Sequence, residues 1–296
     1  MESFSVSKND LNNLEKLWIH KDVVNTESTL YKFPNPTTDQ MLILKHFFVS
    51  GDEFFDNKMA KLEKICQIDK DHVFPELVFP NGYVYVDNKL QGLTLPYIQG
   101  ASLKRLLSHP DIPFKSKIHY LKEIGKLLEK MKEYRDKGQY PGFYLYDIHE
   151  SNFMIDSLTN ELKVVDIDGA AIDGFFPDRS MYLNYLAKRM ECKDKYPITR
   201  DALYHKVVTP SDNSELYCYY MMILNLIADE KMSLIKDTQL FEYLDYLLTL
   251  GYPWEIIGNI ASLYGNRDNI NPYELLDMLP NNPNATYKNY LRAKRL

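Results

Sequence analysis

The chain has 296 residues, of which 45% are hydrophobic and 26% are charged, proportions that are ordinary for a folded protein with a sizeable core. The formal net charge of −6 argues against a dedicated nucleic-acid binder, because such proteins are usually basic. The cysteines Cys66, Cys192 and Cys218 are scattered and odd in number, without a C-x-x-C pair, which argues against a structural zinc site or a disulfide framework.

The sequence shows no signal for export or membrane insertion. Its start, MESFSVSKNDLNNLEK, lacks the basic region and apolar stretch of a secretory signal. No stretch approaches the run of about 18 apolar residues that a transmembrane helix needs. We therefore expect a cytoplasmic protein without a membrane span.

The first third of the chain predicts strands and one long helix. Leucines at helical spacing predict that residues 1–20 form a short helix. The alternating run at 28–33 and the apolar run at 41–48 predict two strands. Residues 52–68 carry apolar side chains on one helical face and predict a helix.

Two further strands and a new helix follow. Residues 74–97 predict two strands around a polar turn at 87–89. A short extended link leads to Ser102, which we expect to cap the N-terminus of a helix. Residues 115–134 predict a longer amphipathic helix.

Polar residues flank a predicted hairpin in the middle of the chain. Its strands are residues 153–155 and 162–165, with Asp147 and Asn152 before the first and Asp166 after the second. Antiparallel strands bring their outer ends together, so these three side chains are expected to converge. Carboxylate and amide oxygens suit Mg²⁺ that carries phosphates. The alternative is a surface hairpin with solvated acids.

The last part of the chain predicts helices. Residues 181–190 look helical, and the apolar run at 221–227 predicts a buried helix that begins near residue 211. Residues 232–279 predict two or three more helices. From Pro280 the chain is rich in Asn and Pro and then basic, which is typical of a tail.

The order of the central residues resembles the protein kinase-like superfamily. Asp147-Ile-His-Glu-Ser-Asn152 resembles the D-x-H-x-x-N catalytic loop of atypical and aminoglycoside-type kinases. Val165-Asp166-Ile167 resembles the start of the D-F-G metal motif and follows at a kinase-like distance. Leu42-Ile-Leu-Lys45 is similar to the V-A-I-K strand, and Glu63 on the next helix has the offset of its ion-pair partner.

This resemblance implies an α+β, bilobal fold. The N-lobe, residues 1–96, would hold a small antiparallel sheet with one main helix, preceded by a helical extension at residues 1–20. The C-lobe, residues 97–296, would be larger and mainly helical, with a short basic tail. The resemblance covers about residues 28–230.

The resemblance also implies an ATP- and Mg²⁺-dependent kinase that phosphorylates a hydroxyl group. Asp147 would be the catalytic base, and Lys45, held by Glu63, would bind the α- and β-phosphates of ATP. The implied metal ligands are Asn152, Asp166 and Asp168. The residues expected to contact the nucleotide, besides Lys45, are Leu95, Pro96 and Ile98 at the hinge and Ser28 and Thr29 before the lysine strand.

The chain departs from the family pattern at Leu145 and Tyr146, which replace the His and the basic residue of H-R-D, at Asp168, which stands where D-F-G has Gly, and in two further places. Residues 24–29, which precede the lysine strand, contain no glycine, although glycine lets a backbone approach phosphates closely. No A-P-E motif follows Asp166. An alternative is therefore a catalytically weak or inactive nucleotide-binding pseudokinase that acts as a scaffold.

The acceptor is open between a protein and a small molecule. His149 favours the aminoglycoside and choline kinase branch, whereas Glu215 stands where protein kinases begin a buried helix with Asp. The stretch from 169 to 209 is long enough for an activation-type loop in which Ser180 and Tyr182 would be modified. We expect the acceptor to be a protein hydroxyl, by resemblance to that branch.

Overall fold

The chain forms two compact units. The structure, a computed structural model, describes residues 1–17, 27–69, 73–177, 180–190, 198–229, 235–267 and 270–295. The first unit is Met1–Gly100 with Asp156–Asp168, and the second is Ala101–Ile155 with Gly169–Leu296. Strands dominate the first unit and helices the second, which confirms the expected α+β class. The predicted boundary between the lobes lies after residue 96, whereas the first unit extends to Gly100 and also includes residues 156–168.

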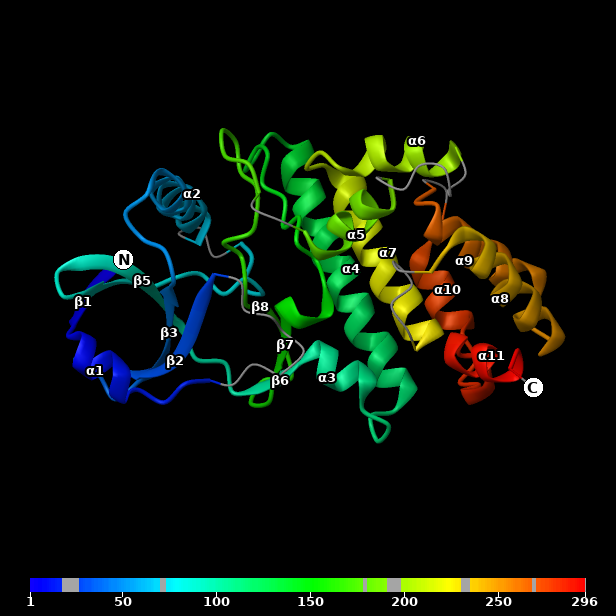
Figure 1. Ribbon diagram of the computed structural model, residues 1–296, viewed down its shortest axis with the longest axis horizontal. Coiled ribbons are helices and arrows are strands. Elements are labelled where there is room, and N and C mark those ends of the chain that lie inside the picture. The colour runs from blue at the N-terminus through cyan, green and yellow to red at the C-terminus, as the bar shows by residue number, and fades with distance from the viewer. Residues whose placement is uncertain are drawn as a thin grey trace. The chain divides into compact units, whose positions relative to one another are not determined.

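A five-stranded sheet is the centre of the first unit (Figure 1). Its strands are β1 (Glu2–Val6), β2 (Ser28–Pro34), β3 (Met41–Phe47), β4 (Gly82–Val86) and β5 (Lys89–Pro96). Their order is β1-β4-β5-β3-β2. β1 runs parallel to β4, and the other neighbours are antiparallel. The strands predicted around 28–33, 41–48 and the turn at 87–89 are therefore confirmed.

The two faces of β3 point into different surroundings, because successive side chains in a strand alternate. Leu42 and Leu44 are fully buried in one core cluster, which also holds Phe4 and Phe33. Phe47 lies on the opposite face, in a second cluster with residues of the helix α2 (Glu53–Asp69). Lys45, two residues before Phe47, therefore lies on the face that α2 covers.

The long helix α2 confirms the prediction for residues 52–68. Asp52 accepts a hydrogen bond from the Phe55 N–H at 2.8 Å, which satisfies one of the free donors at the helix start. Phe55, Met59 and Leu62 are buried against the sheet. Their spacing of four and three residues is that of one helical face.

The N-terminal prediction was wrong in its main element. Residues 1–20 were expected to be helical, but Glu2–Val6 form a strand and only Lys8–Asn13 (α1) form a helix. The alternation of Ser and apolar residues favours a strand, and β4 offers it an edge to pair with. Ser7 and Asp10 then form a capping box that starts α1. Residues 18–20 of this prediction lie outside the described part of the chain.

The predicted hairpin belongs to a sheet of three short strands. β6 (Gly100–Ser102), β7 (Phe153–Asp156) and β8 (Leu162–Val164) are all present, and β7 and β8 are neighbours in their sheet. The Asp156 N–H donates to the Glu161 carbonyl at 3.0 Å and closes the turn. The predicted hairpin is therefore confirmed.

The second unit is built around one buried helix, α7 (Asp212–Ala228), in which most side chains are buried. α4 (Phe114–Asp136) and α9 (Trp254–Tyr264) pack against it. The other helices of this unit are α3 (Leu103–Ser108), α5 (Met181–Met190), α6 (Ile198–Val207), α8 (Asp237–Thr249), α10 (Pro272–Met278) and α11 (Tyr287–Ala293). Predicted helices correspond to α2, α4, α5, α7, α8, α9 and α10, and Ser102 caps α3 as expected.

Two segments expected to be irregular contain helices instead. α6 lies within the stretch predicted as an activation-type loop, and α11 lies within the predicted basic tail. Ser180 and Tyr182 are 2% and 1% exposed, so the expectation that they are modified in an open loop was wrong. Tyr287 and Tyr290 are buried, and this burial explains why the end of the chain is ordered as a helix.

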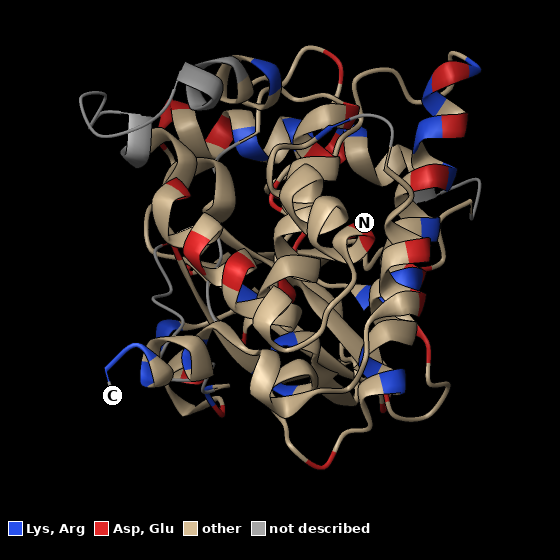
Figure 2. Cartoon of the chain, turned by 90° about the vertical axis from the view of Figure 1, so that its right-hand side faces the viewer, with Lys and Arg blue, Asp and Glu red and all other residues tan. Residues whose placement is uncertain are grey.

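Acidic and basic residues are interspersed along the helices of the second unit (Figure 2). Within the described residues, none of the helices has both the length and the apolar character that a membrane span requires.

Candidate functional site

Lys45 lies between two carboxylates in the first unit. Its Nζ is 2.9 Å from Asp166 Oδ1 and 2.7 Å from Asp168 Oδ1. β3 supplies the lysine, and the segment directly after β8 supplies both acids. The Lys45 side chain is 10% exposed and that of Asp168 8%, whereas that of Asp166 is 45% exposed. The sequence-predicted residues Lys45, Asp166 and Asp168 are therefore brought together.

A second lysine completes this cluster. Lys58 of α2 places its Nζ 3.2 Å from Asp168 Oδ2 and 2.6 Å from Glu27 Oε2. The Lys58 side chain is 2% exposed. The aromatic ring of Phe47 lies 5.6 Å from the Lys45 Nζ and 5.5 Å from the Lys58 Nζ, distances at which a ring face attracts a cation.

The opposite charges decide the protonation states of the cluster. Burial opposes the charge on Lys45, but Asp166 and Asp168 outweigh it and raise the pKa of Lys45. Burial also opposes ionisation of Asp168, but Lys45, a hydrogen bond from Asp166 and then Lys58 hold the pKa of Asp168 well below its ordinary value. Partial burial and the like charge of Asp168 raise the pKa of Asp166 to about 7. Of the two acids, Asp168 is thus the firmly ionised one.

The predicted ion pair between Lys45 and Glu63 was wrong. Glu63 is exposed, and its Oε1 accepts a hydrogen bond from the Tyr83 hydroxyl at 2.6 Å. Burial and this carboxylate raise the pKa of Tyr83. Glu63 follows Lys58 by five positions, which places their side chains about 140° apart around the helix axis. Only one of them can face β3, and it is Lys58.

The residues that were expected to contact the nucleotide lie in different parts of the first unit. Ser28 and Thr29 lie within β2 and pair with Phe47 and His46 of β3. They therefore belong to a strand, as predicted for residues 28–33, and not to a turn before it. Leu95 pairs with Ile43 and is half-buried.

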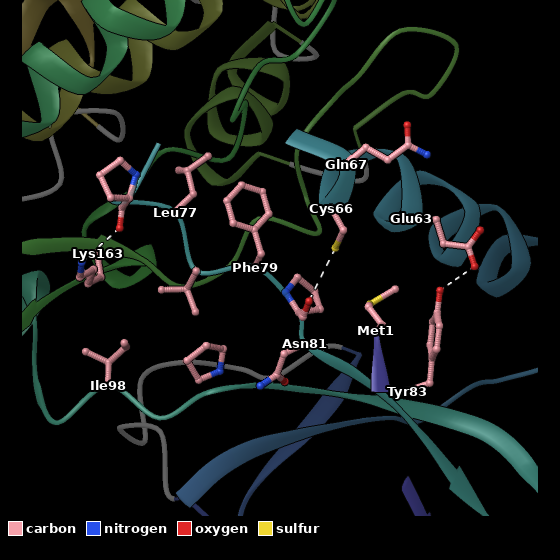
Figure 3. Close-up of a pocket in the computed structure, with 14 residues that line it drawn as sticks. Met1, Glu63, Cys66, Gln67, Leu77, Phe79, Asn81, Tyr83, Ile98 and Lys163 are labelled. Carbon is pink, nitrogen blue, oxygen red and sulfur yellow. Dashed lines mark hydrogen bonds between the residues drawn. The ribbon is translucent and has the colours of Figure 1, made fainter. Parts of the chain in front are cut away.

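Pro96 and Ile98 line a cavity of about 720 Å³ within the first unit (Figure 3). Leu77 and Phe79, from the segment between α2 and β4, supply part of its apolar wall. Glu63 and Tyr83 point toward each other at its edge (Figure 3). The residues that line this cavity do not include Lys45, Ser28, Thr29 or Leu95. The hinge positions and the lysine cluster are therefore separate features.

Asp147, His149 and Asn152 are brought together in the second unit. Asn152 Nδ2 donates to the Asp147 carbonyl at 2.9 Å and lies 3.4 Å from Asp147 Oδ2. His149 Nε2 is also 3.4 Å from that Oδ2. The Ser151 N–H points at His149 Nδ1, 3.3 Å away, so a neutral ring carries its proton on Nε2. The Met181 N–H donates to Asp147 Oδ1 at 2.8 Å, leaving Oδ2 with the longer contacts.

The residue before Asp147 has a strained backbone. Tyr146 has a φ of 57°, and the Asp147 N–H donates to the Leu145 carbonyl at 2.6 Å. This is a γ-turn whose central residue is left-handed, which is a rare conformation. The Tyr146 hydroxyl donates to the Val208 carbonyl at 2.7 Å, and burial raises its pKa to about 12. Strain held in place by tertiary contacts is common at functional sites.

A buried ion pair holds the segment that leads into this turn. Arg135 of α4 donates to the Phe143 carbonyl at 2.8 Å and to Glu215 Oε2 of α7 at 2.7 Å. Its guanidinium also lies over the Tyr144 ring, 4.3 Å from the centroid. Glu215 Oε1 accepts from the Leu145 N–H at 2.8 Å. Residues 143–145 are thereby fixed to two helices.

The segment that begins at Gly169 lies beside the segment that leads into Asp147. Tyr144 and Ala171 form an antiparallel bridge, with N–H to carbonyl distances of 3.0 and 2.8 Å. A side chain at Gly169 would meet Asp147 Cβ at 3.6 Å, which is ordinary van der Waals contact. Gly169, the residue that directly follows Asp168, therefore neighbours Asp147.

The predicted metal ligands are divided between the two units. Within the described ranges, no three His, Cys, Asp or Glu side chains are grouped so that they could hold a metal ion. The predicted ligands are instead two aspartates of the first unit and an asparagine of the second. Because Asn152 Nδ2 binds the Asp147 carbonyl, its Oδ1 can serve as a ligand, and Asp166 is partly exposed. Both groups are hard oxygen donors and suit Mg²⁺.

Lys58, Glu27 and Arg135 were not predicted from the sequence as site residues. A signal for Lys58 was present, since it stands three residues after Phe55 and four before Leu62, on the apolar face of the helix. Arg135 likewise stands four residues after the buried Met131. A charged residue at an apolar position of a helix has to be paired when buried.

No protein-family model matches the chain, and no curated protein matches it either.

Proposed function

We propose that the chain is an ATP- and Mg²⁺-dependent phosphotransferase of the protein kinase-like type, which transfers the γ-phosphate of ATP to a hydroxyl group. The observation that carries the proposal is the contact of Lys45 with Asp166 and Asp168, more than a hundred residues later in the chain. The contact supports the kinase resemblance, because the resemblance assigns both the strand lysine and the acids after the hairpin to the phosphates and the metal of Mg·ATP.

Each residue has a role in this proposal. Lys45 supplies an ammonium group for the α- and β-phosphates. Asp166 supplies an oxygen ligand for Mg²⁺, which would neutralise phosphate charge when bound, and the resemblance assigns the same role to Asn152. Asp147 accepts the proton of the acceptor hydroxyl through Oδ2, the oxygen with the longer contacts.

A phosphotransfer assay with radiolabelled ATP tests the proposal. The protein is incubated with Mg·ATP alone and with a lysate divided into protein and small-molecule fractions. We expect labelled product from the wild type, and its loss in Asp166→Ala, because transfer relies on charge stabilisation at the phosphates. Asp39→Ala, at an exposed turn of the same unit, is the matched control. Undiminished turnover in Asp166→Ala would contradict the assignment.

The same assay identifies the acceptor. We propose a protein hydroxyl, by resemblance to the protein-kinase branch. Label in the protein fraction, or on the chain itself, supports this choice. Label that appears only in small molecules would instead favour an acceptor of the aminoglycoside or choline type.

A second candidate is a nucleotide-binding scaffold without turnover. The absent Lys45–Glu63 pair favours it, because active kinases of the resembled family depend on that pair. A thermal-shift series with ATP, with and without Mg²⁺, separates the two candidates when combined with a test of ATP consumption. Stabilisation without consumption favours the scaffold, because a ligand that binds only the folded state raises its melting temperature.

A further inference from the structure

Lys58 is a charged residue in an apolar position. It lies on α2, three residues after Phe55 and one before Met59, and the whole residue is 4% exposed. A buried ammonium is expensive unless it is paired and hydrogen-bonded. Asp168 and Glu27 provide this pairing, at 3.2 and 2.6 Å.

Asp168 connects the two lysines of the cluster. Its Oδ1 is 2.7 Å from the Lys45 Nζ and its Oδ2 is 3.2 Å from the Lys58 Nζ. The charges therefore alternate along one chain of contacts. This chain runs Glu27, Lys58, Asp168, Lys45, Asp166, and all five residues belong to the first unit.

We infer that Asp168 is the counter-ion that positions Lys45, and that Lys58 of α2 positions Asp168. The inference rests on the proposed function only in that it takes Lys45 as the phosphate-binding residue. In the resembled family a helix glutamate contacts this lysine directly. Here the helix presents an ammonium, and one carboxylate bridges the two cations.

Asp168 and Asp166 have different roles in this arrangement. Both oxygens of Asp168 are in contact with an ammonium group, and its side chain is 8% exposed. Asp166 uses Oδ1 to contact Lys45, and its side chain is 45% exposed. Asp166 is therefore the carboxylate that a metal ion can reach, and Asp168 is the anchor of the lysines. Lys58 and Asp168 are positioning residues in this scheme.

A double-mutant cycle on stability tests the bridge without any need for activity. The variants are Lys58→Met, Asp168→Asn and the double variant, with Lys89→Met, an exposed lysine of the same unit, as the control for loss of one charge. Because each single change removes one of the two opposite charges that a buried group contacts, we expect both to lower the urea midpoint of unfolding. The double variant should lose clearly less than the sum of the singles. Additive losses would overturn the bridge.

Affinity for Mg·ATP, measured by calorimetry below the melting temperature, separates positioning from mere stability. We expect Lys58→Met to weaken binding about 10-fold or more, as losses of supporting residues commonly do, and Lys58→Arg to stay near the wild-type value. If Lys58→Met does not fold, Glu27→Gln is the weaker substitute, because Glu27 is 42% exposed. Unchanged affinity in the folded variants would overturn the positioning role.

The two experiments fail in different ways. If the wild type binds no Mg·ATP, the proposed function fails, and the stability cycle still decides whether Asp168 bridges the lysines. If the wild type binds Mg·ATP and the cycle is additive, the bridge fails while the nucleotide binding that the proposed function requires is retained.

Discussion

Glu215 and Leu145 are 70 residues apart in the chain, and the Glu215 carboxylate accepts a hydrogen bond from the Leu145 N–H at 2.8 Å. The same carboxylate binds Arg135 through its other oxygen. The contact fixes the backbone two residues before Asp147, on the N-terminal side of the strained Tyr146. α7 therefore contributes to the position of the candidate base without touching it.

Stability should depend on pH through Glu215. Burial, against the pull of Arg135, raises its pKa from 4.5 to about 7. Between these values the folded protein holds a proton that the unfolded chain has released, so the free energy of unfolding falls as pH rises through this window. Glu215→Gln cannot titrate.

The stability difference between wild type and Glu215→Gln should therefore shift against the wild type from about pH 5 to 7 and then level off. Urea unfolding of both proteins at pH values across this window measures it. A difference that is constant with pH, or that shifts toward the wild type, would show that Arg135 and the Leu145 N–H keep Glu215 ionised throughout.

Replacing Lys45 should make the first unit sensitive to Mg²⁺. In Lys45→Met the carboxylates of Asp166 and Asp168 lose the ammonium between them, and we expect a loss of about 3 kcal/mol in the free energy of unfolding. A divalent cation then takes over the neutralising role. Mg²⁺ should raise the melting temperature of Lys45→Met more than that of the wild type.

Lys45→Met/Asp166→Asn is the control for this effect, since it removes one of the two facing charges. It should show a smaller response to Mg²⁺ than Lys45→Met alone. An equal response in both variants would place the Mg²⁺ elsewhere on the protein.

Local patterns were enough to predict most elements of the sheet and of the helical unit. The alternation in β2, the apolar face of α2 and the polar turn between β7 and β8 are short-range features that the structure confirms. β1 was missed because a strand there depends on its partner β4, almost eighty residues away. Strand formation of this kind depends on tertiary context.

The site was predictable only in part. The order of Lys45, Asp147, Asn152 and Asp166 placed each residue beside a correctly predicted element, but the contact of Lys45 with Asp166 was not predicted. The choice between Lys58 and Glu63 was not predictable from kinase spacing, because it depends on how α2 is rotated against β3. Apolar Phe55, Met59 and Leu62 decide this rotation, and it carries Glu63 to Tyr83.

Glu63→Gln distinguishes this structure from the family pattern. Glu63 is exposed and bonded to Tyr83, so its charge is remote from the chain of contacts that holds Lys45. We expect ATP affinity and turnover to stay within about twofold of the wild type, with stability changed by no more than about 0.5 kcal/mol. A loss of turnover as severe as that of Lys45→Met would mean that Glu63 reaches Lys45 during the reaction.

Asp147→Asn should abolish transfer while ATP binding persists. Asn keeps the shape of the side chain and can still accept from the Met181 N–H, which lies 2.8 Å from Oδ1, so the loop should hold its conformation. The amide cannot take up the proton of an acceptor hydroxyl, a step that typically contributes about 100-fold to 10,000-fold in rate. Turnover and Mg·ATP affinity, measured on the same preparation, separate these two effects. Because Lys45, Asp166 and Asp168 belong to the other unit, their part in nucleotide binding should be retained. Turnover that survives in Asp147→Asn would remove Asp147 from the role of base and leave positioning as its function.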